Sequence, residues 1–442
     1  MPMHARPRHT LTSRHHSPSA IWIALCLAAL LAGCGQTAGA APHARSTATT
    51  ATTAPTVTAT IAPATPTFVP LPPLTIIPSS GPPVAGITPS WRQANLPAGF
   101  GMAFHYADTG IFPSDGMIAY SCMGPYTGTS TNIHVVVTHD RGASWASTAD
   151  PPGKWNGCQI MTVDSLNPSI VAVCCGLGTA DVPFQEISTN GGASWRQVSL
   201  PHAATIQALA TRGARTYAIL VARDDSRQQM LAASGDGLRT WHAIDATLPT
   251  SGYSRLWVNP ATGALLLESW PNGLTKELWS SDDDGAHWQQ IIFPVPSREV
   301  VELTVRQPSV AAPWHICALY LDDAGGGIVC TGDGGRTWAQ LPPLVDLPGS
   351  LSDVYEIVAL PEDGSILVVG TTNSDPIRLL YRLPAGATRW QSLGPKPPKS
   401  TGGVAYAPTP DGNDALWTFP AESSGGGAPE PTGAVYSAPY PY

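Results

Sequence analysis

Asp or Asn side chains recur along the chain in one local setting, and a carboxylate in such a setting can act as an acid, a metal ligand or a hydrogen-bond acceptor. Each lies in a stretch of the form Ser/Thr-x-Asp-x-Gly-x-Ser/Thr-Trp. Three copies depart from it at one position each, with Asn190 for Asp, Leu238 for Gly and His287 for Ser/Thr. In chain order the copies contain Asp140 with Trp145, Asn190 with Trp195, Asp236 with Trp241, Asp283 with Trp288, and Asp333 with Trp338.

The order of residue types within each stretch indicates a turn. An Asp or Asn oxygen can accept hydrogen bonds from backbone N–H groups two or three residues ahead, which closes an Asx-type turn. Glycine adopts the positive φ that the turn requires, and the Trp anchors the outgoing strand by burying its ring. None of these roles needs a ligand. We therefore expect the five stretches to be structural turns, and neither catalytic nor metal sites.

The tryptophans that end these stretches are evenly spaced. With Trp91 and Trp390, which belong to two more divergent copies, the successive intervals are 54, 50, 46, 47, 50 and 52 residues. A unit of about 50 residues is the size of one four-stranded blade of a β-propeller. The 45 Pro and 43 Gly residues among 442 also favour short strands joined by turns. The expected fold class is all-β.

The repeated stretch resembles the Asp box, or bacterial neuraminidase repeat (BNR). That repeat occurs in sialidases, sortilin-type receptors, some endoglucanases and photosystem assembly factors. The resemblance covers residues 90–442, and it implies that each box joins the third and fourth strands of a propeller blade. It is specific for the fold and says little about function.

The blade number follows from the same spacing. Six complete units end at Trp390. Beyond it, residues 403–407, 415–419 and 434–438 provide three more strands, and the residues after Trp91 provide a fourth. We predict a seventh blade made from both ends of the chain, which would remove the exposed sheet edges of an open ring. Six and eight blades are the alternatives.

The N-terminus carries a candidate lipidation site. Three arginines precede an apolar stretch at residues 20–31, which is shorter than the roughly 20 residues that a membrane-spanning helix needs. Leu31-Ala32-Gly33-Cys34 follows and resembles the lipobox of bacterial lipoproteins. The resemblance implies a signal peptide at residues 1–33, a lipid anchor on Cys34, and an extracytoplasmic location at the cell membrane. The alternatives are an ordinary signal peptide and an uncleaved membrane anchor.

The segment after Cys34 has a different composition. Residues 34–89 are rich in Thr, Ala and Pro and contain one charged residue, Arg45. With no hydrophobic period to bury, we expect a disordered, semi-rigid tether between the anchor and the propeller.

Six cysteines remain in the expected mature protein besides Cys34, and an even number in an exported domain favours disulfides. Cys317 and Cys330 fall on adjacent expected strands of one blade and are predicted to pair. The pairing of the other four is left open; these are Cys122, Cys158, Cys174 and Cys175. No Cys-x-x-Cys spacing supports a zinc site, and no cofactor is expected.

Enzymatic activity has weak support in the sequence. The resemblance raises sialidase activity, but the chain has no Arg-Ile-Pro motif. The first blade, where that motif should fall, has no arginine before Arg141, which lies in a box turn, to receive a substrate carboxylate. Another glycosidase needs two carboxylates across a cleft, and the acidic candidates fall mainly in predicted turns. The net charge of −8 also disfavours nucleic acid as a partner.

We therefore expect a lipid-anchored module that binds or assembles with an extracytoplasmic protein or glycan, with a glycoside hydrolase as the alternative. The recognition surface is predicted opposite the boxes, on loops that carry aromatic and basic side chains. The candidate binding residues are Tyr126, Trp155, Tyr253, Trp270, Lys276 and Arg298.

The lipid anchor can be tested directly. Cys34→Ser removes the sulfur that would carry the diacylglycerol, so the variant should be uncleaved or released from the membrane, whereas the wild type should partition with lipid. Mass spectrometry of the mature N-terminus provides the measurement. An unmodified N-terminus at another residue would contradict the prediction.

Overall fold

All the residues that the computed structural model describes belong to one compact unit, which spans residues 71–442. The described parts are residues 71–93, 100–102, 112–113, 119–125, 134–140, 143–149, 160–164, 167, 169–174, 184–222, 229–244, 248–249, 252, 254–271, 275–295, 299–306, 313–321, 326–343, 354–361, 363–372, 375–395, 404–407, 415–418 and 436–439. Cys34 and the expected signal peptide lie outside them, as do residues 35–70 of the expected tether.

The described residues form seven antiparallel sheets, numbered here in chain order, and two of these sheets gain a parallel strand at one edge. Sheet 1 contains β4 (Phe100–Met102), β5 (Phe112–Pro113), β6 (Ala119–Pro125), β7 (His134–Thr138) and β8 (Ala146–Ser147). Sheet 2 contains β9 (Ile160–Val163), β10 (Val171–Cys174), β11 (Phe184–Ser188) and β12 (Arg196–Ser199). A 3₁₀ turn, η1 (Pro201–Ala203), leads to sheet 3, which contains β13 (Thr205–Arg212), β14 (Arg215–Val221), β15 (Gln229–Ser234) and β16 (His242–Ala243).

The remaining sheets continue this order. Sheet 4 contains β17 (Ser254–Val258), β18 (Leu265–Ser269), β19 (Glu277–Ser281) and β20 (Gln289–Gln290). Sheet 5 contains β21 (Glu299–Arg306), β22 (His315–Leu321), β23 (Gly327–Thr331) and β24 (Trp338–Gln340), with β1 (Leu74–Ile76) at its edge. Sheet 6 contains β25 (Val354–Ala359), β26 (Ile366–Thr372), β27 (Asp375–Leu383) and β28 (Gln391–Pro395), with β2 (Val84–Ala85) at its edge. Sheet 7 contains β29 (Val404–Ala407), β30 (Ala415–Thr418), β31 (Tyr436–Pro439) and β3 (Arg92–Gln93).

Most residues of the second strands β14, β18, β22 and β26 are apolar because both faces of a sheet are covered. In β14, Ala218 and Leu220 pack in a cluster with sheet 2, whereas Tyr217 and Ile219 pack in a cluster with sheet 4. Since successive residues of a strand point to opposite faces, a strand buried on both faces reads as a continuous apolar run. The same alternation occurs in the Leu-Leu-Leu run of β18, whose members are fully buried.

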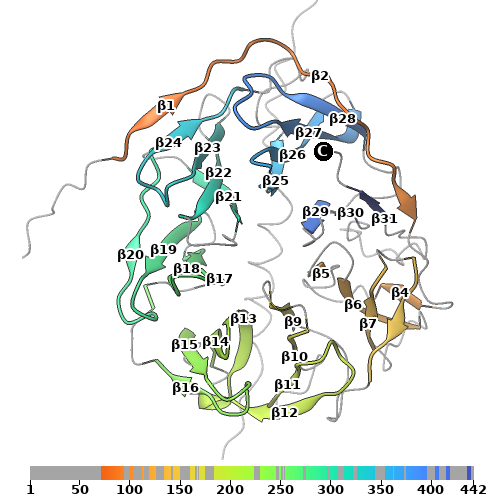
Figure 1. Cartoon of the computed structure of the whole chain (residues 1–442), viewed down its shortest axis with the longest axis vertical. Helices are drawn as coiled ribbons and strands as arrows, with labels where there is room; N and C mark the ends of the chain where they lie inside the picture. Colours follow the sequence, from red (N-terminus) through yellow and green to blue (C-terminus); the bar gives the residue numbers. More distant parts are fainter. Residues whose placement is uncertain are drawn as a thin grey trace, which may run out of the picture. The chain divides into compact units, whose positions relative to one another are not determined.

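Each sheet packs against the next one along the chain. Apolar clusters join sheets 2 and 3, 3 and 4, 4 and 5, 5 and 6, and 6 and 7. Sheet 1 meets sheet 2 where Ala149 N donates to Gly192 O at 3.0 Å, and β29 of sheet 7 contacts β5 of sheet 1. In sheets 2 to 6 the first strands lie on the inner side, and the fourth strands lie farther out (Figure 1).

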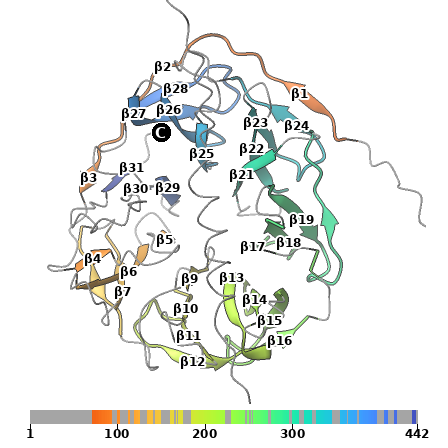
Figure 2. The same cartoon turned by 180° about the vertical axis from the view of Figure 1, so that it is seen from behind.

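Sheet 7 combines the two ends of the described chain. β31 pairs with β30 on one side and with β3 on the other, with Arg92 opposite Ser437 and Gln93 opposite Tyr436. Figure 2 shows β3 beside β31 although the two strands are far apart in the sequence. The strands expected after Trp390 are therefore present close to their predicted positions.

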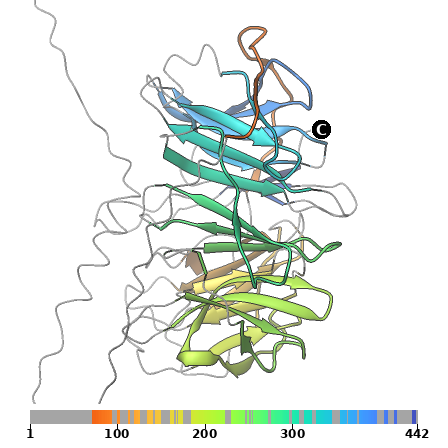
Figure 3. The same ribbon diagram turned by 90° about the vertical axis from the view of Figure 1, so that its left-hand side faces the viewer.

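The prediction of a disordered tether is wrong for residues 71–89. β1 pairs in parallel with β24, and β2 pairs in parallel with β28. Ile77 N donates to Gln340 O at 3.0 Å, and Gly86 N donates to Ser392 O at 2.8 Å. The segment lacks a hydrophobic period because an edge strand needs only its backbone groups to pair with the unpaired groups of a neighbour. Figure 3 shows this orange segment against the teal and blue strands.

The predicted disulfide between Cys317 and Cys330 is confirmed. The two residues lie directly opposite each other on β22 and β23, with a Cα–Cα distance of 4.1 Å. Both are buried in the cluster between sheets 5 and 6. The pairing of the other four cysteines falls outside the described side chains.

Removing residues 434–442 tests the role of the shared sheet. The deletion takes away β31, so β3 loses its partner, β30 keeps only β29, and the buried side chain of Ala438 is lost. We expect a large fall in melting temperature, well above about 2 °C, because one unpaired edge exposes apolar area on both neighbouring strands. Deletion of residues 440–442 alone is the control. Equal melting of both shortened chains would contradict the model.

Candidate functional site

The five repeated stretches all form the turn between the third and fourth strands of a sheet. We call them the repeat turns. In sheet 5, Asp333 Oδ1 accepts hydrogen bonds from the Thr331 hydroxyl at 2.7 Å and from Thr337 N at 2.9 Å, while the Thr337 hydroxyl donates to Oδ2 at 2.6 Å. The corresponding backbone donor lies four residues ahead in every copy. The sequence pattern predicts the donor N–H two or three residues after the Asp or Asn, whereas the structure places it four residues after. Asp236 and Asp333 also accept a second hydrogen bond, from the backbone N–H three residues ahead.

Glycine's conformational role is confirmed, with one instructive exception. Gly192, Gly285 and Gly335 have φ values of 84°, 88° and 95°. Leu238 occupies the same position with φ of 70°, and its N–H donates to Ser234 Oγ at 3.0 Å, as Gly192 N does to Ser188 Oγ. Its side chain is buried against sheet 2. This burial offsets the cost of about 1–2 kcal/mol for a left-handed non-glycine residue.

The hydrogen bonds leave the turn carboxylates saturated. Burial acts to raise the pKa of Asp333, but hydrogen bonds from Thr337 and Thr331 outweigh it and lower the pKa from 3.8 to about 2. Hydrogen bonds from His287 lower the pKa of Asp283 to about 2 in the same way. An ionised carboxylate whose acceptors are occupied within its own turn is a structural group. The geometry thus agrees with a structural role for the turns.

The opposite ends of the sheets have a different character. We call them the loop ends, where the second strand of each sheet ends and the third begins. Three loop ends carry buried polar side-chain atoms with no hydrogen-bond partner; these are Gln185 Nε2, Gln229 Oε1, Glu268 Oε2, Ser269 Oγ and Trp270 Nε1. Gln185 and Ser269 are 0% exposed and Glu268 is 6% exposed. A buried polar atom without a partner costs about 1–3 kcal/mol, so native proteins keep few of them.

A group of four charged side chains lies beside these atoms, between sheets 4 and 5. Lys276 Nζ is 3.0 Å from Glu302 Oε2 and 3.4 Å from Glu268 Oε1. Arg255 Nη1 lies 3.8 Å from Glu268 and 3.9 Å from Glu302. The Lys276 and Glu268 side chains are 9% and 8% exposed, whereas that of Arg255 is 61% exposed. The charges therefore balance within the group.

Glutamines extend the polar surface to sheets 2 and 3. Gln185 Oε1 accepts a hydrogen bond from Ile206 N at 3.0 Å, which links β11 to β13. Gln229 Nε2 donates to Gln207 Oε1 at 2.8 Å. Gln207 is the extra residue of a β-bulge in β13, and β21 has a bulge at the same level, just before Glu302. Bulges change the direction of side chains and are common beside binding sites.

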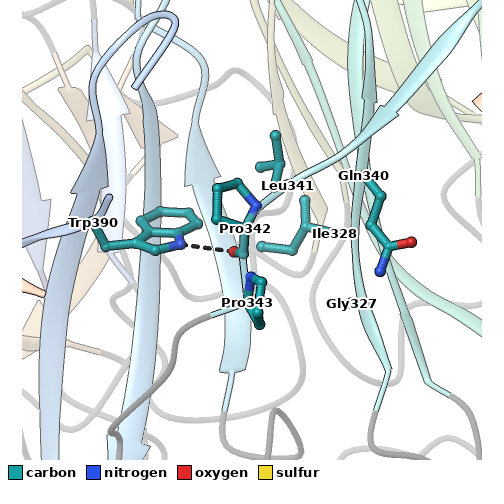
Figure 4. A pocket seen from close by; sticks show the side chains of 7 residues that line it. All are labelled: Gly327, Ile328, Gln340, Leu341, Pro342, Pro343 and Trp390. Atoms are coloured by element: carbon teal, nitrogen blue, oxygen red, sulfur yellow. Dashed lines mark hydrogen bonds between the residues drawn. The ribbon is translucent and has the colours of Figure 1, made fainter. Parts of the chain in front are cut away.

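The structure also has a small cavity of about 60 Å³ between sheets 5 and 6 (Figure 4). Apolar side chains line most of it, including Ile328, Leu341 and Pro342. Trp390 closes one side and donates from Nε1 to Pro342 O at 2.9 Å. The cavity lies where apolar side chains of the two sheets pack together.

The predicted binding residues fall into two groups. Trp270 and Lys276 lie at the loop end of sheet 4, on the side where they were expected. Lys276 is buried among carboxylates, so its ammonium supports this end of the sheet from within. Tyr126, Trp155, Tyr253 and Arg298 lie outside the described residues. Sequence reasoning missed the glutamines, Glu268 and Ser269, although a polar residue ending an apolar strand was an available signal.

A tyrosine–carboxylate pair at the repeat-turn ends joins sheets 3 and 4. The Tyr217 hydroxyl donates to Asp284, which also pairs with Arg215 at 3.0 Å. Burial and the bond to Asp284 raise the pKa of Tyr217 to about 12.

The described residues contain no group of three or more His, Cys, Asp or Glu side chains able to hold a metal ion. In the same part of the chain, no helix is long and apolar enough to cross a membrane.

Comparison with known proteins identifies the fold. No protein-family model and no curated protein matches the sequence. Among solved structures, YCF48 bound to D1 peptide gives a TM-score of 0.51 at 14% identity, covering 82% of this chain and 99% of that chain. An oligogalacturonate lyase in complex with manganese gives 0.52 at 10% identity, covering 81% and 98%. The oligogalacturonate lyase of Vibrio parahaemolyticus gives 0.51 at 10% identity, covering 80% and 98%.

The fold is a β-propeller. At such low identities the likeness shows the fold alone, and the propeller's function has to be argued from its own residues. The polar groups at the loop ends of sheets 2 to 5 form the candidate site.

Asp333→Asn tests the structural role of the repeat turns. Asn190 already holds one turn together with its Oδ1 accepting Ser194 N at 2.9 Å, so the variant should fold. Because the folded-state pKa of Asp333 is depressed from 3.8 to about 2, its contribution to stability is present above pH 3.8 and is lost as the pH falls towards 2. The variant should therefore melt below the wild type at neutral pH, and the difference should shrink over that interval.

Thermal melts at a series of pH values measure this effect. Asp282→Asn, which changes an exposed carboxylate beside the fourth repeat turn, is the control and should leave the pH dependence unchanged. A constant difference between Asp333→Asn and wild type at all pH values would show that the carboxylate charge has no part in the turn.

Proposed function

We propose that this chain is an exported lipoprotein whose propeller binds or assembles with an extracytoplasmic protein or glycan. Cys34 in the sequence Leu-Ala-Gly-Cys supports a lipid anchor at the outer face of the cell membrane, and residues 35–70 connect the anchor to the propeller. In this proposal the repeat turns are Asp boxes, and seven blades close into a ring through the pairing of β3 with β31.

The loop ends of sheets 2 to 4 carry the proposal of a binding surface. Five buried polar atoms without partners gather there, from amide, carboxylate, hydroxyl and indole groups. At the repeat turns the carboxylates are saturated within their own turns, and the buried groups without partners are indole N–H groups, as at Trp195, Trp241 and Trp288. Buried polar atoms without hydrogen bonds raise the free energy of the unliganded protein, and a ligand that forms hydrogen bonds with them would remove this penalty. Likeness to YCF48, a protein solved with a bound D1 peptide, supports a protein ligand at the level of fold only.

A glycoside hydrolase is the second candidate. The observation that favours it is the pair of carboxylates, Glu268 and Glu302, on either side of Lys276. Glycosidases use two carboxylates that flank a sugar. Here both carboxylates contact the same ammonium, which suits a structural ion pair better than a catalytic pair. Turnover of a chromogenic glycoside that Glu302→Gln abolishes would favour the enzyme.

Site-specific photo-crosslinking in cells tests the location of the binding surface. A photoreactive residue in place of Gln207 lies at the loop end of sheet 3, and one in place of Asp282 lies at a repeat turn. We expect discrete adducts from position 207 and none from position 282, because only the first faces the proposed surface. Adducts from position 282 alone, or from neither position, would remove the support for this surface.

A further inference from the structure

We propose that the loop ends of sheets 2 to 4 bind an extended polypeptide segment chiefly through its main chain. This inference rests on the proposed binding function and specifies its ligand. The buried polar atoms without partners include both hydrogen-bond donors and acceptors, and they lie at three consecutive junctions between sheets. The charged side chains around them form ion pairs with one another.

The first step is the position of the groups. Gln185 faces sheet 3, because its Oε1 accepts the backbone N–H of Ile206. Ser269 points to the same side as Leu265 and Leu267, which pack against sheet 3. Glu268 points to the other side, where Lys276 connects it to Glu302 of sheet 5. The junctions between sheets 2 and 3, 3 and 4, and 4 and 5 thus each carry one unsatisfied group.

The second step is the span of this row. Packed sheets lie about 10 Å apart, so three junctions cover about 20 Å. About six residues of extended chain cover that distance at roughly 3.3 Å per residue. A single small ligand cannot reach all three junctions, whereas an extended chain can.

The third step is the chemistry of the row. Gln185 Nε2 and Trp270 Nε1 are donors, Gln229 Oε1 and Glu268 Oε2 are acceptors, and Ser269 Oγ can be either. A polypeptide backbone offers both N–H and C=O groups at every residue. Carbohydrate hydroxyls also offer both, but sugar recognition favours exposed aromatic faces. The exposed large hydrophobic side chains of the described residues are Leu, Ile and Val at positions 71–87, away from this surface.

The fourth step is access. The unsatisfied atoms are buried, but partly exposed side chains border them, among them Gln207, Gln229 and Trp270. Gln207 and Gln229 satisfy each other through one hydrogen bond of 2.8 Å. These two amides can exchange that bond for bonds to a ligand. Lys276 and Arg255 balance Glu268 and Glu302, so this group of four has no excess charge to select a charged ligand.

Binding of the full-length chain to arrays of short synthetic peptides and of glycans tests the inference. We expect peptide binding by the wild type, weakened about tenfold in the double variant Ser269→Ala/Trp270→Phe, since two hydrogen bonds to the ligand are lost. The melting temperature should stay the same or rise, because the buried Ser269 hydroxyl has no partner in the protein. Trp288→Phe is the matched control, since it removes an equally unpartnered indole N–H at a repeat turn.

Main-chain recognition has its own signature. N-methylation of single backbone nitrogens in a bound peptide should weaken binding about tenfold at some positions, while exchange of its side chains should have smaller effects. Equal binding of the N-methylated peptides would overturn the inference, as would the absence of any peptide binding.

Two other results separate this inference from the proposed function. Binding to glycans alone, weakened by the double variant and unaffected by Trp288→Phe, would overturn the polypeptide ligand and leave the binding surface in place. Peptide binding that the double variant does not weaken would overturn both the surface and the inference.

Discussion

Coverage of both faces of every sheet is the constraint on which the rest of this structure depends. The second strands carry apolar side chains on both sides, so no sheet is stable with one face in water. Each sheet therefore needs a neighbour before it and after it. Among the described residues, β29 of sheet 7 contacts β5 of sheet 1, and β3 pairs with β31 in sheet 7.

The same constraint moves polar groups to the ends of the sheets, and the two ends differ. At the repeat-turn ends, carboxylates and hydroxyls saturate one another and the backbone, as around Asp333. At the loop ends, charged groups balance around Lys276, but several buried polar atoms have no partner. In the described part of the chain, the repeat turns keep only indole N–H donors without partners, as at Trp288, whereas the loop ends keep both donors and acceptors.

The sequence allowed the repeat and its consequences to be predicted, because the Asp, Gly and Trp of each turn are close together in the chain. The strands of sheet 7 and the Cys317–Cys330 pair also followed from local pattern. The edge pairing of residues 71–89 could not be predicted, since it uses backbone groups that carry no sequence signal. The buried polar atoms at the loop ends could not be predicted either. Gln185, Gln229 and Glu268 come from three different sheets and come together only when the sheets pack. In the turns, the donor of the main hydrogen bond to the Asp or Asn side chain is the backbone N–H four residues ahead, as at Ser144, and not the one predicted two or three residues ahead.

The edge pairing of the N-terminal segment has a consequence for the time course of folding. β1 and β2 pair with β24 and β28, strands that are synthesised far later. Pairing between strands so far apart in the sequence closes a long loop of chain, and the entropy of that closure is lost late in folding. Proteins in which such long-range contacts predominate fold slowly. The segment therefore remains without partners while sheets 1 to 4 assemble. Its prolines, among them Pro72, Pro73 and Pro78, remove N–H donors from the backbone and so disfavour strand pairing with other copies during that interval.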